Sequence, residues 1–343
     1  MPRTEISEYG EFGLIKHLTE KFKIENPSTL KGVGDDAAVL SYPFKKVLVT
    51  TDLLLEGIHF DLVYVPITHL GYKAAVVNFS DIYAMNGVPK QITVSLGVSK
   101  RFSVEDLEQL YEGIELACKK YGVDLVGGDT SASLTGLAIS ITCIGEADAD
   151  KIVYRNGAKE NDLICVTGDL GSAYMGLQLL EREKMVFSGD DEAQPDFEDR
   201  DYILQRQLRP EARQDIIQLL HEKEILPTSM IDISDGLSSE LIHICTQSNV
   251  GCRVYEDKIP IHYQAVVMAE ELNMNIVTAA LNGGEDYELL FTASLEDYDK
   301  LIAIEGIAIV GHITKPEFGL QLVGREGEEI AMRAQGWNSL DEE

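Results

Sequence analysis

The sequence lacks paired cysteines and any long apolar run. Its five cysteines show neither a CxxC pair nor another zinc-like spacing, which argues against a zinc motif and predicts reduced, buried thiols. No apolar stretch reaches the roughly 18 residues that would cross a bilayer, and the opening residues MPRTEISEYGEFG contain no signal-like segment. We therefore expect a soluble, cytoplasmic protein without a membrane partner.

Positive charge is also scarce: the sequence has 29 Lys and Arg residues against 58 Asp and Glu residues, which gives a formal net charge of −29. Such a field repels nucleic acids and anionic membranes, so no nucleic-acid partner is expected, and an anionic substrate would need local cations. Residues 188–201, SGDDEAQPDFEDRD, concentrate part of this excess. They predict a solvated loop, and an acidic interaction segment is the alternative.

The length of 343 residues predicts two domains, with a boundary near residue 150 that separates 1–150 from 151–343. Runs rich in β-branched residues alternate with helical patterns, so the expected class is α/β (α+β), with a mixed sheet packed with helices in each domain. Strands are expected at 46–52, 91–98, 123–129, 137–146, 162–168, 230–234, 251–256, 287–293 and 307–313, and helices at 68–86, 103–121, from 172, and 237–247.

Six short motifs place carboxylates beside Gly, Ser or Thr at predicted strand or helix ends. Each motif alone is more often a turn or a helix cap than a ligand, but their recurrence favours a functional cluster. The motifs are GDD at 34–36, TTD at 50–52, SD at 80–81, GGD at 127–129, DISDG at 232–236 and GGED at 283–286.

Asp81 is the most informative of these acids. It lies one helical turn after Asn78 in an otherwise apolar helix, so the two polar side chains share a face. An unpaired buried carboxylate costs on the order of several kcal/mol, which predicts a cation or a cleft beside Asp81. A structural salt bridge to Lys or Arg is the alternative.

Clustered carboxylates and Thr hydroxyls suit Mg²⁺, and because carboxylates repel phosphates, a nucleotide would bind here only with several divalent ions between them. The segment GGDTSAS predicts flexible backbone that can approach a phosphate. Other nucleotide signatures are missing. There is no Gly-Lys dipeptide and hence no P-loop, GVGDDA lacks the strand before and helix after that a Rossmann turn needs, and no HRD/DFG pair occurs.

Taken in order, GEFGLI, GDDAAVL, TTDLLLEGIHF, GYKAAVVNFSDIYAMNGVPK, GGDTS, ISDGL and GGEDYELLFT resemble the thiamine-monophosphate kinase family over essentially the whole chain. That family is part of a superfamily of ATP-dependent enzymes with aminoimidazole ribonucleotide synthetase and selenophosphate synthetase. The resemblance implies two α/β domains with the active site in the cleft between them, a homodimer, and Mg²⁺ and ATP as cofactor and co-substrate.

The resemblance also implies roles for residues that match the family's motifs. The expected metal ligands are Asp36, Thr50, Thr51, Asp52, Asp81, Asp129, Asp232 and Asp235. The expected ATP contacts are Tyr111, Gly128, Asp129, Arg155 and Ser234, and catalysis would depend most on Asp52, Asp81, Asp129 and Arg155. The expected contacts to thiamine monophosphate are His59, Trp337 and either Glu285 or Asp286.

The implied reaction is transfer of the ATP γ-phosphoryl group to thiamine monophosphate, the last step of thiamine diphosphate biosynthesis. The acceptor phosphate has a second pKa of about 6, so it is largely ionised at neutral pH and needs no general base. Two alternatives stay open: another ATP-dependent synthetase of the same superfamily, and a non-catalytic regulator that binds nucleotide or metal.

Overall fold

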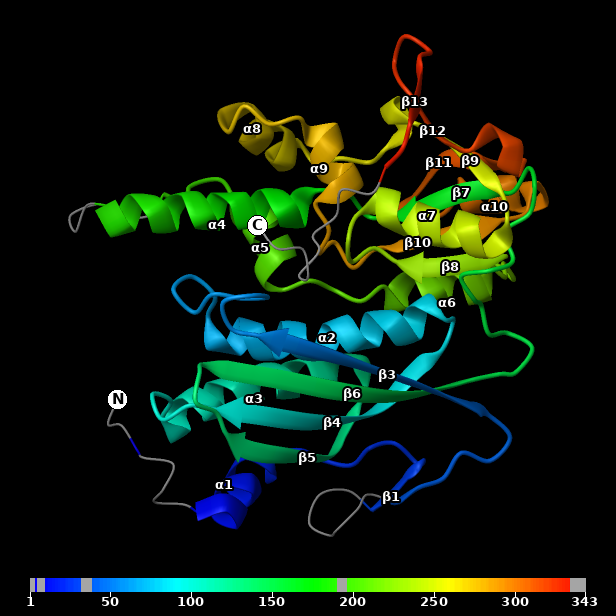
Figure 1. The fold of residues 1–343 in the computed structure, drawn as a ribbon. Coiled ribbons are helices and arrows are strands. Elements are labelled where there is room, and N and C mark those ends of the chain that lie inside the picture. The colour runs from blue at the N-terminus through cyan, green and yellow to red at the C-terminus, as the bar shows by residue number, and fades with distance from the viewer. Residues whose placement is uncertain (1–3, 5–9, 32–38, 190–195, 334–343) are drawn as a thin grey trace. The chain divides into compact units, whose positions relative to one another are not determined.

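The computed structural model describes residue 4 and residues 10–31, 39–189 and 196–333 (Figure 1). The chain divides into two compact units, which are considered separately. The first unit comprises Met1–Tyr83 and Gly87–Asp150, and the second comprises Ala84–Asn86 and Lys151–Glu343. That these units are independent domains stays a prediction.

The first unit is built on a four-stranded sheet in the order β3-β6-β4-β5, in which only the β4 and β5 pair is parallel. A separate two-stranded sheet joins β1 and β2. The elements are α1 (Gly10–Thr19), β1 (Thr29–Lys31), β2 (Val39–Leu40), β3 (Lys46–Leu55), α2 (Ile67–Ala84), β4 (Val88–Val98), α3 (Val104–Tyr121), β5 (Asp124–Ala132) and β6 (Leu137–Ala147).

The two faces of this sheet differ. Every second residue of β6 is buried, including Ile139, Ile141 and Cys143, and the residues between them are only partly covered. Such alternation is typical of a sheet with one face on the core, and here α2 and α3 provide that core. We call the covered face the helix face and the other the open face.

The second unit contains a seven-stranded sheet in the order β13-β12-β9-β11-β7-β10-β8, in which only the β12 and β9 pair is parallel. Its strands are β7 (Leu163–Thr167), β8 (Ser229–Asp232), β9 (Gly251–Tyr255), β10 (Leu289–Ala293), β11 (Ile307–Thr314), β12 (Leu320–Val323) and β13 (Glu329–Ala331). Its helices are α4 (Ser172–Gly189), α5 (Asp201–Leu208), α6 (Gln214–Glu222), α7 (Leu237–Ser248), α8 (Tyr263–Glu271), α9 (Ile276–Asn282) and α10 (Tyr298–Leu301).

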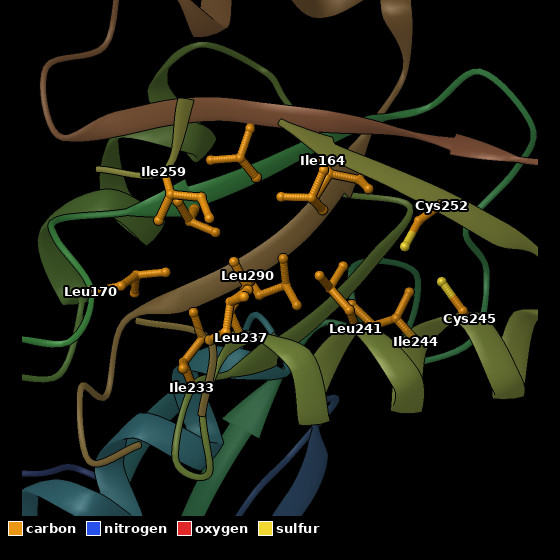
Figure 2. Packing of buried hydrophobic residues seen from close by; sticks show 14 of the residues in the cluster. Ile164, Leu170, Ile233, Leu237, Leu241, Ile244, Cys245, Cys252, Ile259 and Leu290 are labelled. Atoms are coloured by element: carbon orange, nitrogen blue, oxygen red, sulfur yellow. The ribbon is translucent and has the colours of Figure 1, made fainter. Parts of the chain in front are cut away.

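Helix α7 packs its apolar face on this second sheet, as Figure 2 shows for Leu237, Leu241 and Ile244. The Cys245 thiol of α7 meets the Cys252 thiol of β9 at the edge of this core, and all five cysteines of the chain are buried and unpaired by disulfides, as predicted. The core fixes α7, and with it the loop that precedes the helix, against β8 and β10.

The α/β class and all nine predicted strands and four predicted helices are confirmed, within a few residues at their ends. The prediction of flexible backbone at GGDTSAS was wrong, because β5 continues through Ala132 in parallel pairing with β4. Residues 190–195 of the predicted acidic loop lie outside the described residues. No helix in the described ranges has the length and apolar character needed to cross a membrane.

Candidate functional site

In the first unit, two predicted ligands meet between β3 and α2. Thr50 and Asp52 of β3 pair with the buried Cys143 and Ile141, so both side chains lie on the helix face. The Thr50 hydroxyl donates to Oδ2 of Asp81 on α2 at 2.5 Å. Burial, and next the charge of Asp81, raises the pKa of Asp52 to about 7. The structure therefore brings Thr50, Asp52 and Asp81 together.

These three residues fit a hard cation. Two neighbouring carboxylates, of which Asp81 raises the pKa of Asp52, form with the Thr50 hydroxyl an oxygen-only donor set of the kind Mg²⁺ takes. One turn earlier on α2, the buried Oδ1 of Asn78 has no hydrogen-bond partner among the described atoms, so another oxygen acceptor lies on the same helix. A bound cation would relieve the repulsion between Asp52 and Asp81.

Thr51 and Asp129 lie on the open face instead. Thr51 accepts a hydrogen bond from the Thr142 hydroxyl at 3.1 Å, and Asp129 pairs with the exposed Ser95 of β4. Strand alternation therefore separates both side chains from Asp52. In the described part of the chain, no three acids, histidines or cysteines converge as a metal site, so the full ligand set stays a prediction.

The remaining first-unit residues lie at separate places. His59 follows β3 and accepts a hydrogen bond at Nδ1 from the Leu55 amide at 3.0 Å. Tyr111 of α3 is buried edge-on to Phe22 and lines a hollow with His17. Packing alone explains why glycine occupies position 128, since a Cβ there would lie 2.0 Å from the Val94 carbonyl oxygen. Asp36 and Trp337 lie outside the described residues.

In the second unit, the DISDG and GGED motifs form one pair of loops. The Glu285 amide donates to the Ser234 carbonyl at 2.7 Å, and the Tyr287 amide donates to the Ile233 carbonyl at 2.9 Å. The DISDG loop is held from the other side by Glu240 of α7, whose Oε1 accepts from the amides of Ser234 and Asp235 at 3.0 and 2.8 Å. Predicted metal, ATP and substrate residues thus share one small region of this unit.

Charge also links these residues. Burial raises the pKa of Asp235, the Glu285 carboxylate raises it further, and His243 and Arg155 lower it. Arg155 is exposed, so its guanidinium is accessible to an anion. Asp232, at the end of β8, is 5% exposed.

Glu285 and Asp286, the two acids between which the sequence did not decide, differ in access. Asp286 has no exposed surface, and its carboxylate accepts from the Gly171 amide at 3.2 and 3.0 Å. Glu285 is partly exposed and accepts from the Gln207 side chain at 3.3 Å. Glu285 is therefore the acid that a small molecule can reach in this structure.

Sequence reasoning missed a buried ionic cluster beside these loops. Arg206 ion-pairs with Glu288 at 3.0 Å, Arg213 ion-pairs with Glu288 at 2.7 Å, and Tyr202 donates to Asp169. A signal was present for Asp169, because Gly168-Asp169 after β7 again places a carboxylate beside Gly, as several of the six motifs do. The two arginines had no such signal, since their partners lie about 75 to 82 positions away.

Comparison with known proteins defines the class of this chain. Residues 34–147 match the family model "AIR synthase related protein, N-terminal domain", and residues 159–319 match "AIR synthase related protein, C-terminal domain". Crystal structures of the hydrogenase maturation protein HypE share the fold, with a TM-score of 0.73 at 19% identity over 92% of this chain and 96% of the other. The chain is thus an AIR-synthase-related protein.

Closer relatives define the family. The chain is 36% identical to the thiamine-monophosphate kinase of Aquifex aeolicus over 91% of this chain and 98% of the relative, and 37% identical to that of Bacillus subtilis over 85% and 86%. The structure described as "AaThiL complexed with AMPPCP and TMP" matches with a TM-score of 0.73 at 33% identity over 97% and 98% of the chains. The chain belongs to the thiamine-monophosphate kinase family and is a phosphotransferase of that kind.

Proposed function

We propose that this chain transfers the γ-phosphoryl group of ATP directly, in line, to the phosphate of thiamine monophosphate, giving thiamine diphosphate and ADP. The observation that carries the proposal is the pair of carboxylates at Asp52 and Asp81 between β3 and α2. The paired loops of the second unit and the membership of the thiamine-monophosphate kinase family support it. A relative was solved with AMPPCP and TMP, which supports a nucleotide and thiamine monophosphate as the two ligands here.

The reaction requires two polyanions to approach each other. Mg²⁺, when bound, neutralises phosphate charge and orients the oxygens for in-line transfer. Asp52, Asp81 and Thr50 would hold it in the first unit, and we propose Asp36, Thr51, Asp129, Asp232 and Asp235 as further ligands. Arg155 binds phosphate oxygens as a fixed cation.

Tyr111, Gly128 and Ser234 are proposed to contact ATP, whereas His59, Trp337 and Glu285 are proposed to orient the acceptor. The chain needs no general base, because the acceptor phosphate is already ionised at neutral pH. Catalysis then depends on positioning and charge neutralisation by this chain's residues. We further propose a cytoplasmic homodimer that carries out the last step of thiamine diphosphate biosynthesis.

A coupled assay for ADP tests the function. With ATP and Mg²⁺, we expect turnover with thiamine monophosphate and at least about tenfold less with thiamine, aminoimidazole ribonucleotide precursors or selenide, since each lacks the correctly placed acceptor phosphate. A chelator should abolish turnover, and added Mg²⁺ should restore it. Turnover with another acceptor alone would favour a synthetase, and Mg-ATP binding with no turnover would favour a regulator.

A further inference from the structure

Arg206 joins two segments of the second unit that are distant in sequence. Its Nη2 donates to the Asp169 carbonyl at 3.2 Å and to the Asp286 carbonyl at 3.1 Å, and the same nitrogen lies 3.0 Å from the Glu288 carboxylate. The Arg206 side chain is 11% exposed. A guanidinium suits this place because it is permanently charged and its outer nitrogens donate in fixed directions at the end of a long side chain.

The segment that Arg206 holds has an unusual backbone. Glu285 and Tyr287 have φ angles of 64° and 51°, a region that side-chain-bearing residues seldom adopt. Asp286, whose carbonyl accepts from Arg206, lies between them. Such conformations persist only where surrounding contacts over-determine them, and they concentrate at ligand sites.

Helix α5 holds this segment at a second point. Gln207, the residue after Arg206, donates through Nε2 to the Glu285 carboxylate at 3.3 Å. The Tyr287 hydroxyl approaches the other Glu285 oxygen at 3.4 Å. Helix α5 therefore contacts both the Asp286 carbonyl and the Glu285 side chain, so a shift of α5 or of its side chains would move the Glu285 carboxylate.

We propose that Arg206 is a positioning residue that, with Gln207, sets the Glu285 carboxylate for the thiamine monophosphate acceptor without touching it. This inference rests on the proposed function. Glu285 would attract the cationic thiamine ring, and its position would decide how well the acceptor binds. The nucleotide should be affected less, because the polar partners of Arg206 in the described part of the chain are Asp169, Asp286 and Glu288, none of which is proposed to bind ATP.

The test is a comparison of Michaelis constants in the full-length protein. Arg206→Lys keeps the charge, but the lysine side chain is one bond shorter, so its ammonium falls short of the position of Nη2; the KM for thiamine monophosphate should rise about tenfold and that for ATP less than about twofold. Gln207→Met keeps the side-chain volume but removes the hydrogen bond to Glu285, so it should raise the KM for thiamine monophosphate about threefold. Calorimetric binding of thiamine monophosphate should weaken in parallel.

Arg213→Gln is the matched control, because Arg213 also ion-pairs with Glu288 but donates to neither carbonyl. Arg213→Gln should leave the KM for thiamine monophosphate and the KM for ATP within about twofold of the wild-type values, since it removes an ion pair with Glu288 but no hydrogen bond to the Asp169 or Asp286 carbonyl. The positioning role is overturned if Arg213→Gln raises the acceptor constant as much as Arg206→Lys, or if folded Arg206→Lys leaves it unchanged. Should Arg206→Lys not fold, an unchanged constant in Gln207→Met overturns it. A wild-type protein inactive with thiamine monophosphate would instead refute the proposed function.

Discussion

Asp52 is a carboxylate in an environment that disfavours its charge. Burial and the neighbouring Asp81 raise its pKa to about 7. Carboxylates with pKa values perturbed in this way concentrate at functional sites. The Thr50 hydroxyl that donates to Asp81 lessens the repulsion but supplies no positive charge. Asp52 and Asp81 therefore form the oxygen-rich position at which we propose that a cation binds.

Replacing Asp52 with Asn should abolish most activity and leave the fold intact. We expect kcat to fall at least about 100-fold, because phosphoryl transfer depends on charge neutralisation, whereas the melting temperature should stay the same or rise as the repulsion with Asp81 is lost. Steady-state kinetics and thermal unfolding measure both. Asp150→Asn, at an exposed acid of the same unit, is the control. A folded Asp52→Asn variant with near-normal turnover would contradict the metal assignment.

Asp286 predicts a pH dependence of stability. Burial raises its pKa to about 7, although Arg206 and the Gly171 amide act against this. Between about pH 4 and 7 the folded protein then keeps a proton that the unfolded chain has lost, so this residue's contribution to stability falls as pH rises through that window and is constant above it.

The Asp286→Asn variant should lack this slope. The wild-type free energy of unfolding should therefore decline relative to that of the variant between pH 4 and 7, by about 1.4 kcal/mol for each unit of pKa shift. Denaturant unfolding at several pH values measures the difference, with Asp150→Asn as an exposed control. Parallel curves for Asp286→Asn and wild type would show that Asp286 is ionised throughout.

Helices α2 and α3 approach each other through two glycines. A Cβ on Gly71 of α2 would lie 2.0 Å from the Leu110 carbonyl oxygen, and a Cβ on Gly113 of α3 would lie 1.9 Å from the Thr68 carbonyl oxygen. The capping box of Ser103 and Asp106 begins α3. This close crossing places α2, and so Asp81, at a defined depth over the sheet.

Gly113→Ala should force the two helices apart. We expect a loss of about 2–4 kcal/mol in stability, because overpacking against backbone outweighs the roughly 1 kcal/mol that Ala gains in helix propensity. Activity should fall as well, since Asp81 moves with α2. Urea denaturation measures the loss, and Ser103→Ala, which should cost about 1 kcal/mol through the lost cap, is the comparison. An unchanged midpoint for Gly113→Ala would mean that α2 and α3 can separate freely.

The open face of the first-unit sheet bears on the whole molecule's assembly. Strand β3 has one neighbour, β6, among the described strands, and its Val47, Val49 and Leu53 are 48%, 66% and 53% exposed. A long strand edge with apolar side chains invites association unless it is covered. We propose that a second copy binds to this surface in the proposed homodimer.

Charges placed on this face should dissociate the dimer. We expect the wild-type protein to have the mass of a dimer by light scattering and Val49→Lys with Leu53→Lys to shift it to monomer, weakening association at least about tenfold because buried lysines lose hydration. Val63→Lys, at a residue that is equally exposed but outside the sheet, should remain dimeric. A double variant that stays dimeric would place the interface elsewhere.

Some features of this molecule follow from short stretches of sequence. Alternating apolar residues and glycine or proline stops predict the strands and helices, because these patterns reflect a local period of two or 3.6 residues. Four of the six motifs likewise identify the acids that gather in the first unit at Asp52 and Asp81 and in the second unit at the DISDG and GGED loops.

Tertiary structure alone decided which of these acids can act together. It placed Thr50 and Asp52, rather than Thr51, on the face that meets α2, and it buried Asp286 beside the accessible Glu285, because pairing register and packing depend on partners far along the chain. Arg206 shows the same limit, since its contacts with Asp169 and Asp286 span 37 and 80 positions and leave no periodic trace in the sequence.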